Sequence, residues 1–194
     1  MLGDGELAPI QATITLNSRA DLKYSKFVAD LGKRLLGERP RIYKRKDYNA
    51  LILYYNGRFL VNFLVKIGLK IGNKVRQQID APAWIKNFLP YKIACLRGIM
   101  DTDGEIFLHK YKVNDKKYFY RKVCFVNRSI PLLNFVKNTL KELGFNPKLI
   151  NNVANKRVWL YNSVEVANYL KKLEQIILDL ESRRVTQTVT RTVC

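Results

Sequence analysis

The residues best suited to chemistry are two aspartates that occupy matching places in two copies of one short motif. Asp4 and Asp103 each begin an Asp-Gly-Glu sequence, which is followed by an aliphatic residue, Leu7 or Ile106. A single Asp-Gly-Glu is typical of a turn, because Asp and Gly favour turn conformations. Its recurrence inside a wider repeat instead favours a pair of carboxylates, which repel one another when close unless a cation lies between them.

The second copy extends from Leu96 to Glu105 and reads Leu-Arg-Gly-Ile-Met-Asp-Thr-Asp-Gly-Glu. The apolar stretch before it predicts a helix over 91–103, which Gly104 can end in the left-handed conformation common after helix C-termini. Asp103 would then lie at the helix C-terminus, where the helix dipole disfavours a negative charge. A residue that breaks a local rule is a candidate for function, and a divalent cation would offset its cost.

The charge balance of the chain favours a polyanionic partner. The 194 residues include 35 Lys and Arg against 16 Asp and Glu, a net charge of +19. Such an excess repels itself unless it faces a polyanion, so nucleic acid is the expected partner rather than an anionic membrane surface. No apolar window is long enough to span a membrane, and no basic region followed by an apolar run indicates a secretory signal. We therefore expect an intracellular protein, in cytoplasm, nucleoid or an organelle.

Several other chemistries lack the residues that they need. Cys95, Cys124 and Cys194 are odd in number and far apart, which fits neither a disulfide framework nor a zinc site. His109 is the only histidine, so zinc hydrolysis and Ser-His-Asp catalysis have almost none of the residues that they need.

The hydrophobic pattern predicts the same order of elements in each half of the chain. In the first half we expect strands at 11–16 and 50–55, a helix over 22–36 capped by Ser18, and a helix at 58–67. In the second half, strands near 106–111, 119–126, 148–150 and 157–161 alternate with helices at 131–143 and 164–180. A polar turn is predicted at 114–117.

The halves also match in sequence beyond the acidic motif. Asn17 corresponds to Asn127, and Tyr55-Asn56 corresponds to Tyr161-Asn162. Elements that keep their order while turns change length indicate a duplicated unit. We predict an α+β fold of two pseudo-symmetric αββαββα repeats, packed through their motif helices, with two twisted antiparallel sheets. Gly98 would let the two motif helices approach closely.

The predicted domain boundaries follow from this duplication. The first repeat covers 1–72 with its leading helix truncated, a connector covers 73–90, the second repeat covers 91–181, and a tail covers 182–194. The first motif begins at Met1, so most of the helix that should pack against residues 96–102 is absent. A monomer is expected if that helix is complete, and otherwise another chain can supply it.

Basic and aromatic residues gather on the predicted hairpins. A β-ribbon fits the major groove of DNA, where its side chains can reach base edges, while others contact phosphates. The DNA-binding candidates are Arg41, Tyr43, Lys44, Arg45 and Lys46 in the first half, and Lys110, Lys112, Lys116, Lys117, Tyr118, Arg121, Lys156 and Arg157 in the second.

The segment from Leu96 to Gly104 is similar to the signature of the LAGLIDADG homing endonucleases. The order of repeats resembles the single-chain form of that family, and Pro82-Ala83-Trp84-Ile85 resembles its connector. The resemblance spans nearly the whole chain. It implies that the sheets form a DNA-binding saddle, and that the protein cleaves both strands of a long asymmetric site, in an intron-free or intein-free host gene, by Mg²⁺-dependent hydrolysis. Mn²⁺ or Ca²⁺ could occupy the same site.

The resemblance also implies roles for individual residues. Asp4 and Asp103 would bind the metal, together with the preceding Gly3 and Thr102. Asn17 and Asn127, with their basic neighbours Arg19 and Arg128, would organise water around it, and Lys46 or Lys156 would be weaker candidates. Helix capping is the alternative role for the two asparagines.

Two other functions remain open. One is a non-cleaving RNA-splicing maturase or DNA-binding regulator of the same fold, with intron RNA as a possible partner. The other is a basic, RNA-associated structural protein, which would leave the repeated acidic motif unexplained.

Overall fold

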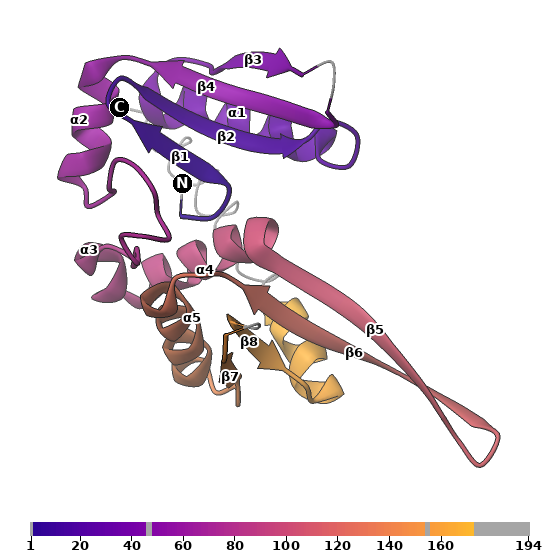
Figure 1. Cartoon of the computed structure of the whole chain (residues 1–194). Helices are drawn as coiled ribbons and strands as arrows, with labels where there is room; N and C mark the ends of the chain where they lie inside the picture. Colours follow the sequence, from indigo (N-terminus) through magenta and orange to yellow (C-terminus); the bar gives the residue numbers. More distant parts are fainter. Residues whose placement is uncertain (1, 46–47, 154–155, 173–194) are drawn as a thin grey trace, which may run out of the picture.

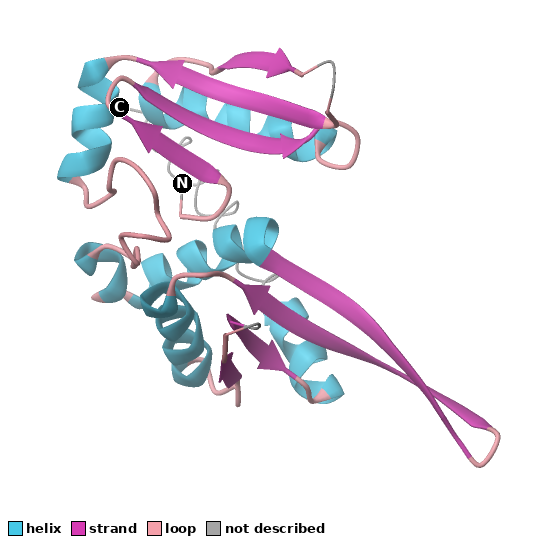
Figure 2. Cartoon of the chain, viewed as in Figure 1, coloured by secondary structure: helices cyan, strands magenta, loops and turns pink. Residues whose placement is uncertain are grey.

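The computed structural model describes residues 2–45, 48–153 and 156–172 of the chain as two units, each built on a four-stranded antiparallel sheet (Figure 1, Figure 2). The strand order is β1-β2-β4-β3 in the first sheet and β5-β6-β8-β7 in the second. These two orders are the same once the numbering is shifted by one repeat. The prediction of an α+β fold with two antiparallel sheets is confirmed.

The first unit contains β1 (Gly5–Ala8), β2 (Gln11–Asn17), α1 (Leu22–Leu36), β3 (Arg41–Lys44), β4 (Ala50–Asn56) and α2 (Arg58–Lys66). The prediction that Ser18 caps α1 is wrong, because Asp21 occupies the N-cap position. Asn17 Oδ1 accepts hydrogen bonds from the backbone N–H groups of Arg19 and Ala20, so it already satisfies the turn before α1. The Ser18 hydroxyl is buried and has no hydrogen-bond partner among the described residues.

The second unit follows the short helix α3 (Ala83–Lys86) and contains α4 (Leu89–Asp103), β5 (Gly104–Val113), β6 (Lys116–Val126), α5 (Ile130–Glu142), β7 (Lys148–Asn151) and β8 (Lys156–Leu160). A further helix occupies 163–172. Strands β5 and β6 are longer than predicted, because the turn consists only of Asn114 and Asp115, both at positive φ. This is the backbone that a two-residue hairpin turn requires. The hairpin extends well beyond its sheet (Figure 1).

Three predicted features lie partly or wholly outside the described residues. These are Lys46, the part of the 164–180 helix beyond 172, and the tail at 182–194.

Gly104 ends α4 in a way that the sequence did not indicate. Its backbone is extended, with φ −92° and ψ 150°, so the prediction of a left-handed residue is wrong. The chain instead passes directly from α4 into β5. A Cβ atom at Gly104 would lie 2.4 Å from the backbone oxygen of Met100, so glycine is required here by close packing.

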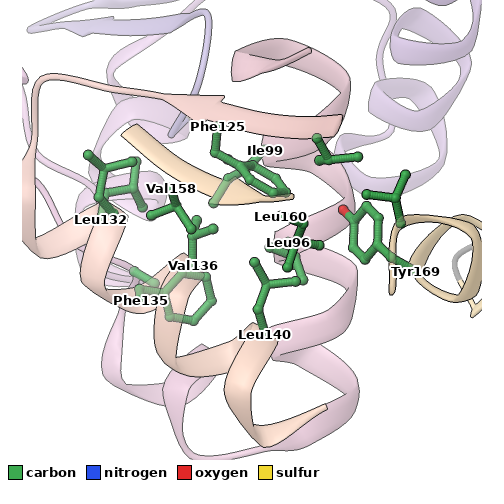
Figure 3. Packing of buried hydrophobic residues seen from close by; sticks show 14 of the residues in the cluster. Leu96, Ile99, Phe125, Leu132, Phe135, Val136, Leu140, Val158, Leu160 and Tyr169 are labelled. Atoms are coloured by element: carbon green, nitrogen blue, oxygen red, sulfur yellow. The ribbon is translucent and has the colours of Figure 1, made fainter. Parts of the chain in front are cut away.

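The hydrophobic core lies mainly in the second unit. One cluster of 15 buried residues joins α4, α5, β6 and β8, and Figure 3 shows Leu96, Leu140 and Leu160 gathered within it. Ile79 and Ala81, from the predicted connector, belong to the same cluster. The first unit has two separate clusters, of four and three buried residues. The core therefore anchors α4, and with it Asp103, firmly to the second sheet.

In the described structure no helix lies close to Gly98, so its predicted role in a helix–helix contact stays a prediction. A Cβ atom added to Gly98 would meet nothing within 4 Å. A mainly apolar cavity of about 350 Å³ lies there, lined by Gly98, Cys95, Ile14, Val28, Leu64 and others. This cavity lies between the units, where the predicted leading helix of the first repeat would pack. Among the described residues, every helix is too short or too polar to span a lipid bilayer.

Candidate functional site

The two copies of the motif touch at the residues just before their aspartates. A Cβ atom on Gly3 would lie 1.9 Å from Thr102 Oγ1, so the backbone of the first copy runs directly against the second copy. Leu2 packs on the core of the second unit. This contact, which only glycine allows at position 3, brings the first acidic motif to the C-terminus of α4.

Asp103 is held by an asparagine from the next strand. Asn127 Nδ2 donates a hydrogen bond of 2.7 Å to Asp103 Oδ2, while Asn127 Oδ1 accepts one from the Ser129 backbone N–H. Asn127 therefore orients the carboxylate and also holds the turn just before α5, whose N-cap residue is Ser129. The predicted role of Asn127 in organising water around a metal stays a prediction.

Asp4 and Asp103 lie within electrostatic reach of one another. Burial raises the pKa of Asp103, and the Asp4 charge raises it further, while the Asn127 hydrogen bond and Lys74 act in the opposite direction. Burial also raises the pKa of Asp4, against the effect of Lys74. Desolvation and a like charge both disfavour the ionised form of a carboxyl group. The arrangement therefore favours a neighbouring cation.

The Lys74 ammonium lies close to both acids, and the sequence did not predict it. Its Nζ donates a hydrogen bond to the backbone oxygen of Gly3. Burial lowers the pKa of Lys74, whereas Asp103, Asp4 and Glu6 raise it. Nothing in the local sequence distinguishes Lys74 from Lys70 in the same connector, so only its position in the fold could have revealed it.

The other two predicted metal ligands are engaged within the protein. The Gly3 carbonyl accepts the hydrogen bond from Lys74, and the Thr102 hydroxyl donates to the Gly98 backbone oxygen at 3.1 Å. Among the described residues no group of three or more His, Cys, Asp and Glu side chains could hold a metal. The site thus offers two carboxylates, which fits a hard divalent cation that keeps several waters or takes phosphate oxygens.

A cavity of about 690 Å³ with both polar and apolar lining residues opens beside Asp103. Its lining includes Asn127 and Lys74 together with three further basic residues, Arg128, Lys156 and Arg157. Arg157 Nε is buried without a hydrogen-bond partner among the described residues. A guanidinium N–H left unpaired in a basic cavity is well suited to a phosphate oxygen.

Asn17 and Arg19 occupy a different setting from their counterparts. Asn17 Oδ1 bonds only to the turn before α1, and no hydrogen bond in the described structure joins it to Asp4. The Arg19 side chain is exposed and forms no ion pair among the described residues. The local sequence is repeated, but the contact with the acid is not.

The predicted DNA-binding residues on β3, β5 and β6 are exposed, and the register separates them by face, whereas Lys156 and Arg157 on β8 are partly buried and line the cavity. Pairing places Arg41, Tyr43, Lys116 and Tyr118 on the faces turned away from the buried residues of their sheets. Lys44, Lys110, Lys112, Lys117 and Arg121 lie on the opposite faces. Arg45 follows β3 and lies over the Tyr48 ring at 4.6 Å. The long β5–β6 hairpin therefore carries positive charge on both of its faces.

The two cysteines in the described part of the chain, Cys95 and Cys124, are not reactive thiolates. Burial raises the pKa of both Cys95 and Cys124 to about 11, so both are protonated near neutral pH. The thiolate is the reactive form of cysteine.

Comparison with known proteins agrees with this architecture. Residues 90–177 match the model of the LAGLIDADG-like domain. The fold is similar to that of the I-LtrWI LAGLIDADG homing endonuclease bound to target DNA, with a TM-score of 0.54 and 13% identity over 90% of this chain and 80% of that one. Meganuclease I-SmaMI bound to uncleaveable DNA gives a TM-score of 0.54 and 12% identity over 86% and 73%.

The N-terminal LAGLIDADG domain of DUF199/WhiA is also similar, with a TM-score of 0.52 and 12% identity over 88% of this chain and 75% of that one. No curated protein sequence matches the chain closely enough to count as a relative. The duplicated strand order and the paired acidic motifs define a LAGLIDADG-type fold. Residues 90–177 belong to the LAGLIDADG-like domain family, and the resemblance seen in the sequence is confirmed.

Proposed function

We propose that this protein is a site-specific DNA endonuclease that hydrolyses phosphodiester bonds with the help of a divalent cation. The observation that carries the proposal is the contact between Gly3 and Thr102, which brings Asp4 and Asp103 from separate repeats to the same place, with Asp103 lining a basic cavity. Paired carboxylates of raised pKa have no evident structural purpose. They fit a cation and, with the cavity, a phosphate.

Separate residues of the chain would bind the metal, orient its ligand and bind the phosphate. Asp4 and Asp103 would hold Mg²⁺, or Mn²⁺ or Ca²⁺ in its place, and Asn127 would fix the rotamer of Asp103. A divalent cation bound there supplies charge neutralisation at the phosphate and lowers the pKa of water. Arg128, Lys156 and Arg157 would bind the phosphate within the cavity that Asp103 also lines.

The net charge of +19 supports DNA as the substrate. Each Lys or Arg that neutralises a phosphate releases a counterion, which favours association at low salt. The outer faces of the two sheets offer Arg41, Tyr43 and Lys116 for contacts along a duplex, as the saddle implied by the family resemblance requires. The similar structures of I-LtrWI and I-SmaMI are both complexes with DNA. An endonuclease of this kind would act in the compartment that holds its target DNA, which is the cytoplasm, the nucleoid or an organelle.

The alternative is a DNA- or RNA-binding protein of the same fold that does not cleave. Two observations favour it. The Lys74 ammonium lies within electrostatic reach of both acids and donates a hydrogen bond to the Gly3 carbonyl, and among the described residues no asparagine contacts Asp4 as Asn127 contacts Asp103. Under this alternative Lys74 replaces the divalent cation.

One experiment distinguishes the two functions. Duplexes that bind the protein are selected from a random library and then incubated with it in Mg²⁺ or in a chelator. The endonuclease predicts Mg²⁺-dependent cleavage that Asp103→Asn and Asp4→Asn abolish while duplex affinity stays nearly unchanged. Tight, selective binding with no cleavage in Mg²⁺ or Mn²⁺ would contradict it.

The role of Lys74 gives a second test with a readout other than cleavage. Mn²⁺ affinity is measured by calorimetry for the wild type, Lys74→Gln and the control Lys66→Gln, which changes the same charge at the end of α2. If Lys74 replaces the cation, Lys74→Gln binds Mn²⁺ more tightly and gains no cleavage. If the protein is an endonuclease, the wild type binds Mn²⁺ measurably and Asp4→Asn weakens that binding.

A further inference from the structure

Residues 72–79, which we call the clamp segment, connect the two repeats and are bonded to both of them. At the start of the segment, the Gly72 backbone N–H donates a 2.9 Å hydrogen bond to the Leu7 carbonyl on β1. Two residues later, Lys74 Nζ donates a hydrogen bond to the Gly3 carbonyl, next to Asp4. The first half of the clamp segment therefore holds the first acidic motif.

The second half of the clamp segment holds the turn between β6 and α5. Gln78 Nε2 donates a hydrogen bond of 3.3 Å to the Arg128 carbonyl, and Gln78 Oε1 accepts one of 3.0 Å from the Ile130 backbone N–H. Gln78 Nε2 also donates to the Val75 carbonyl at 2.7 Å, within the segment itself. One side chain thus bonds to the turn at two points.

This turn is the one that orients Asp103. Its first residue, Asn127, donates the 2.7 Å hydrogen bond to the Asp103 carboxylate. The Ser129 hydroxyl attaches the same turn to the clamp segment, because it donates to the carbonyl of Ile79, a buried core residue. A displacement of the turn would move Asn127 and so release the Asp103 carboxylate.

Gln78 has an unfavourable backbone conformation. Its φ is 43°, in the left-handed region that residues other than glycine seldom adopt. The other two non-glycine residues at positive φ in the described part of the chain, Asn114 and Asp115, form the β5–β6 hairpin turn, which requires that backbone. Backbone strain of this kind persists only where the surrounding contacts hold the residue, and it is found most often at functional sites.

The equivalent turn of the first repeat, over 17–21, has no such support. The Ser18 backbone N–H donates to the Asn49 carbonyl at 2.9 Å, and the Asn17 backbone N–H donates to Asp21 Oδ2 at 2.8 Å. Within the described residues, the hydrogen bonds of this turn stay inside the first unit. The clamp segment therefore holds only one of the two turns, and that turn carries the asparagine that reaches an acid.

We infer that the clamp segment sets the separation of Asp4 from Asp103, with Lys74 positioning the first acidic motif and Gln78 positioning the turn that supports the second. A shared cation requires its two ligands to be held to within a fraction of an ångström, which supporting contacts provide. The benefit for metal binding rests on the proposed function. The effect on the distance between the two motifs does not.

Proton NMR of the full chain tests the clamp segment without any metal. Gly3 packs directly against Thr102, so a nuclear Overhauser effect between the Gly3 α protons and the Thr102 methyl group is expected in the wild type. We expect Gln78→Gly and Lys74→Met each to lose most of that intensity. Gln77→Gly is the matched control and should keep it, because the Gln77 side chain bonds only to the Ile71 carbonyl in the same connecting chain.

A second pair of measurements separates positioning from stability. Glycine adopts positive φ without strain, so Gln78→Gly should unfold at nearly the wild-type temperature although its side-chain hydrogen bonds are lost. In the same variant, calorimetry should show Mn²⁺ affinity reduced about 10-fold, as for other contacts that support a metal ligand. The Gln77→Gly control should bind Mn²⁺ like the wild type.

The outcomes distinguish the clamp segment from the proposed function. A wild type that binds no Mn²⁺ and cuts no DNA would contradict the proposed function, and the nuclear Overhauser intensities would then decide the role of the clamp segment alone. Intensities equal to the wild type in both Gln78→Gly and Lys74→Met would overturn the inference. An equal loss in the Gln77→Gly control would overturn it as well.

Discussion

The two repeats have the same strand order, yet they differ in how their sheets are supported. In the second repeat α4 lies on the sheet and joins α5, β6 and β8 in one cluster of 15 buried residues. In the first repeat no helix occupies the equivalent place in the described structure, and its buried residues divide into clusters of four and three. A cavity of about 350 Å³ separates the first sheet from α4. The same fold pattern therefore gives one well-packed repeat and one open repeat.

The difference extends to the acidic site. Asp103 lies at the end of a well-anchored helix and accepts a hydrogen bond from Asn127. Asp4 precedes β1 and is accompanied mainly by Lys74, which bonds to its neighbour Gly3. The second repeat thus supplies the fixed half of the site. The first supplies a half whose position depends on the Gly3–Thr102 contact.

The largest expected effect concerns the two cores. Leu160 on β8 and Leu53 on β4 are both fully buried, each on the third strand of its sheet. We expect Leu160→Ala to lower the free energy of unfolding by about 4 kcal/mol and Leu53→Ala by about 2 kcal/mol, because the first repeat is already loosely packed. Chemical denaturation measures both. Equal losses would show that the first repeat is as well supported as the second.

A smaller effect should separate the two asparagines. Asn127→Ala removes the hydrogen bond to Asp103, and loss of such a supporting contact typically weakens metal affinity or activity about 10- to 100-fold. Asn17→Ala should leave both nearly unchanged and instead cost about 1 kcal/mol of stability through the turn before α1. Mn²⁺ calorimetry and cleavage assays of both variants check this. A similar loss of Mn²⁺ affinity in both would mean that the repeats are functionally symmetric.

A further pair of opposite effects concerns two glycines of the second motif. Gly98→Ala should stabilise the chain by about 0.5–1 kcal/mol, because alanine favours a helix and the added methyl group meets open space. Gly104→Ala should destabilise it by about 1–3 kcal/mol, because its Cβ would meet the Met100 backbone. Thermal unfolding measures both. A destabilising Gly98→Ala would show that another helix, from this chain or a partner, covers the cavity.

The sequence predicted the features that local chemistry dictates. The repeated Asp-Gly-Glu and the alternating strands were enough to predict two similar sheets and a pair of acids, since both depend on short-range patterns. Lys74 was missed because its role depends on where a connector passes, which no pattern encodes. Asn17 and Asn127 are equivalent in sequence, and only the packing of each repeat decides which one reaches an acid. Gln78 likewise gains its role from a turn that lies far along the chain.

The proposed endonuclease site requires that Asp4 and Asp103 lie together and share one cation. Carbon-13 NMR titration of the Asp103 carboxyl group, in the wild type and in Asp4→Asn, tests this most directly. Because the Asp4 charge raises the pKa of Asp103, the variant should show a lower pKa at Asp103. Asp30→Asn, which removes a charge from the distant α1–Arg39 ion pair, should leave it unchanged. An Asp103 pKa that is the same in Asp4→Asn and the wild type would contradict a shared site.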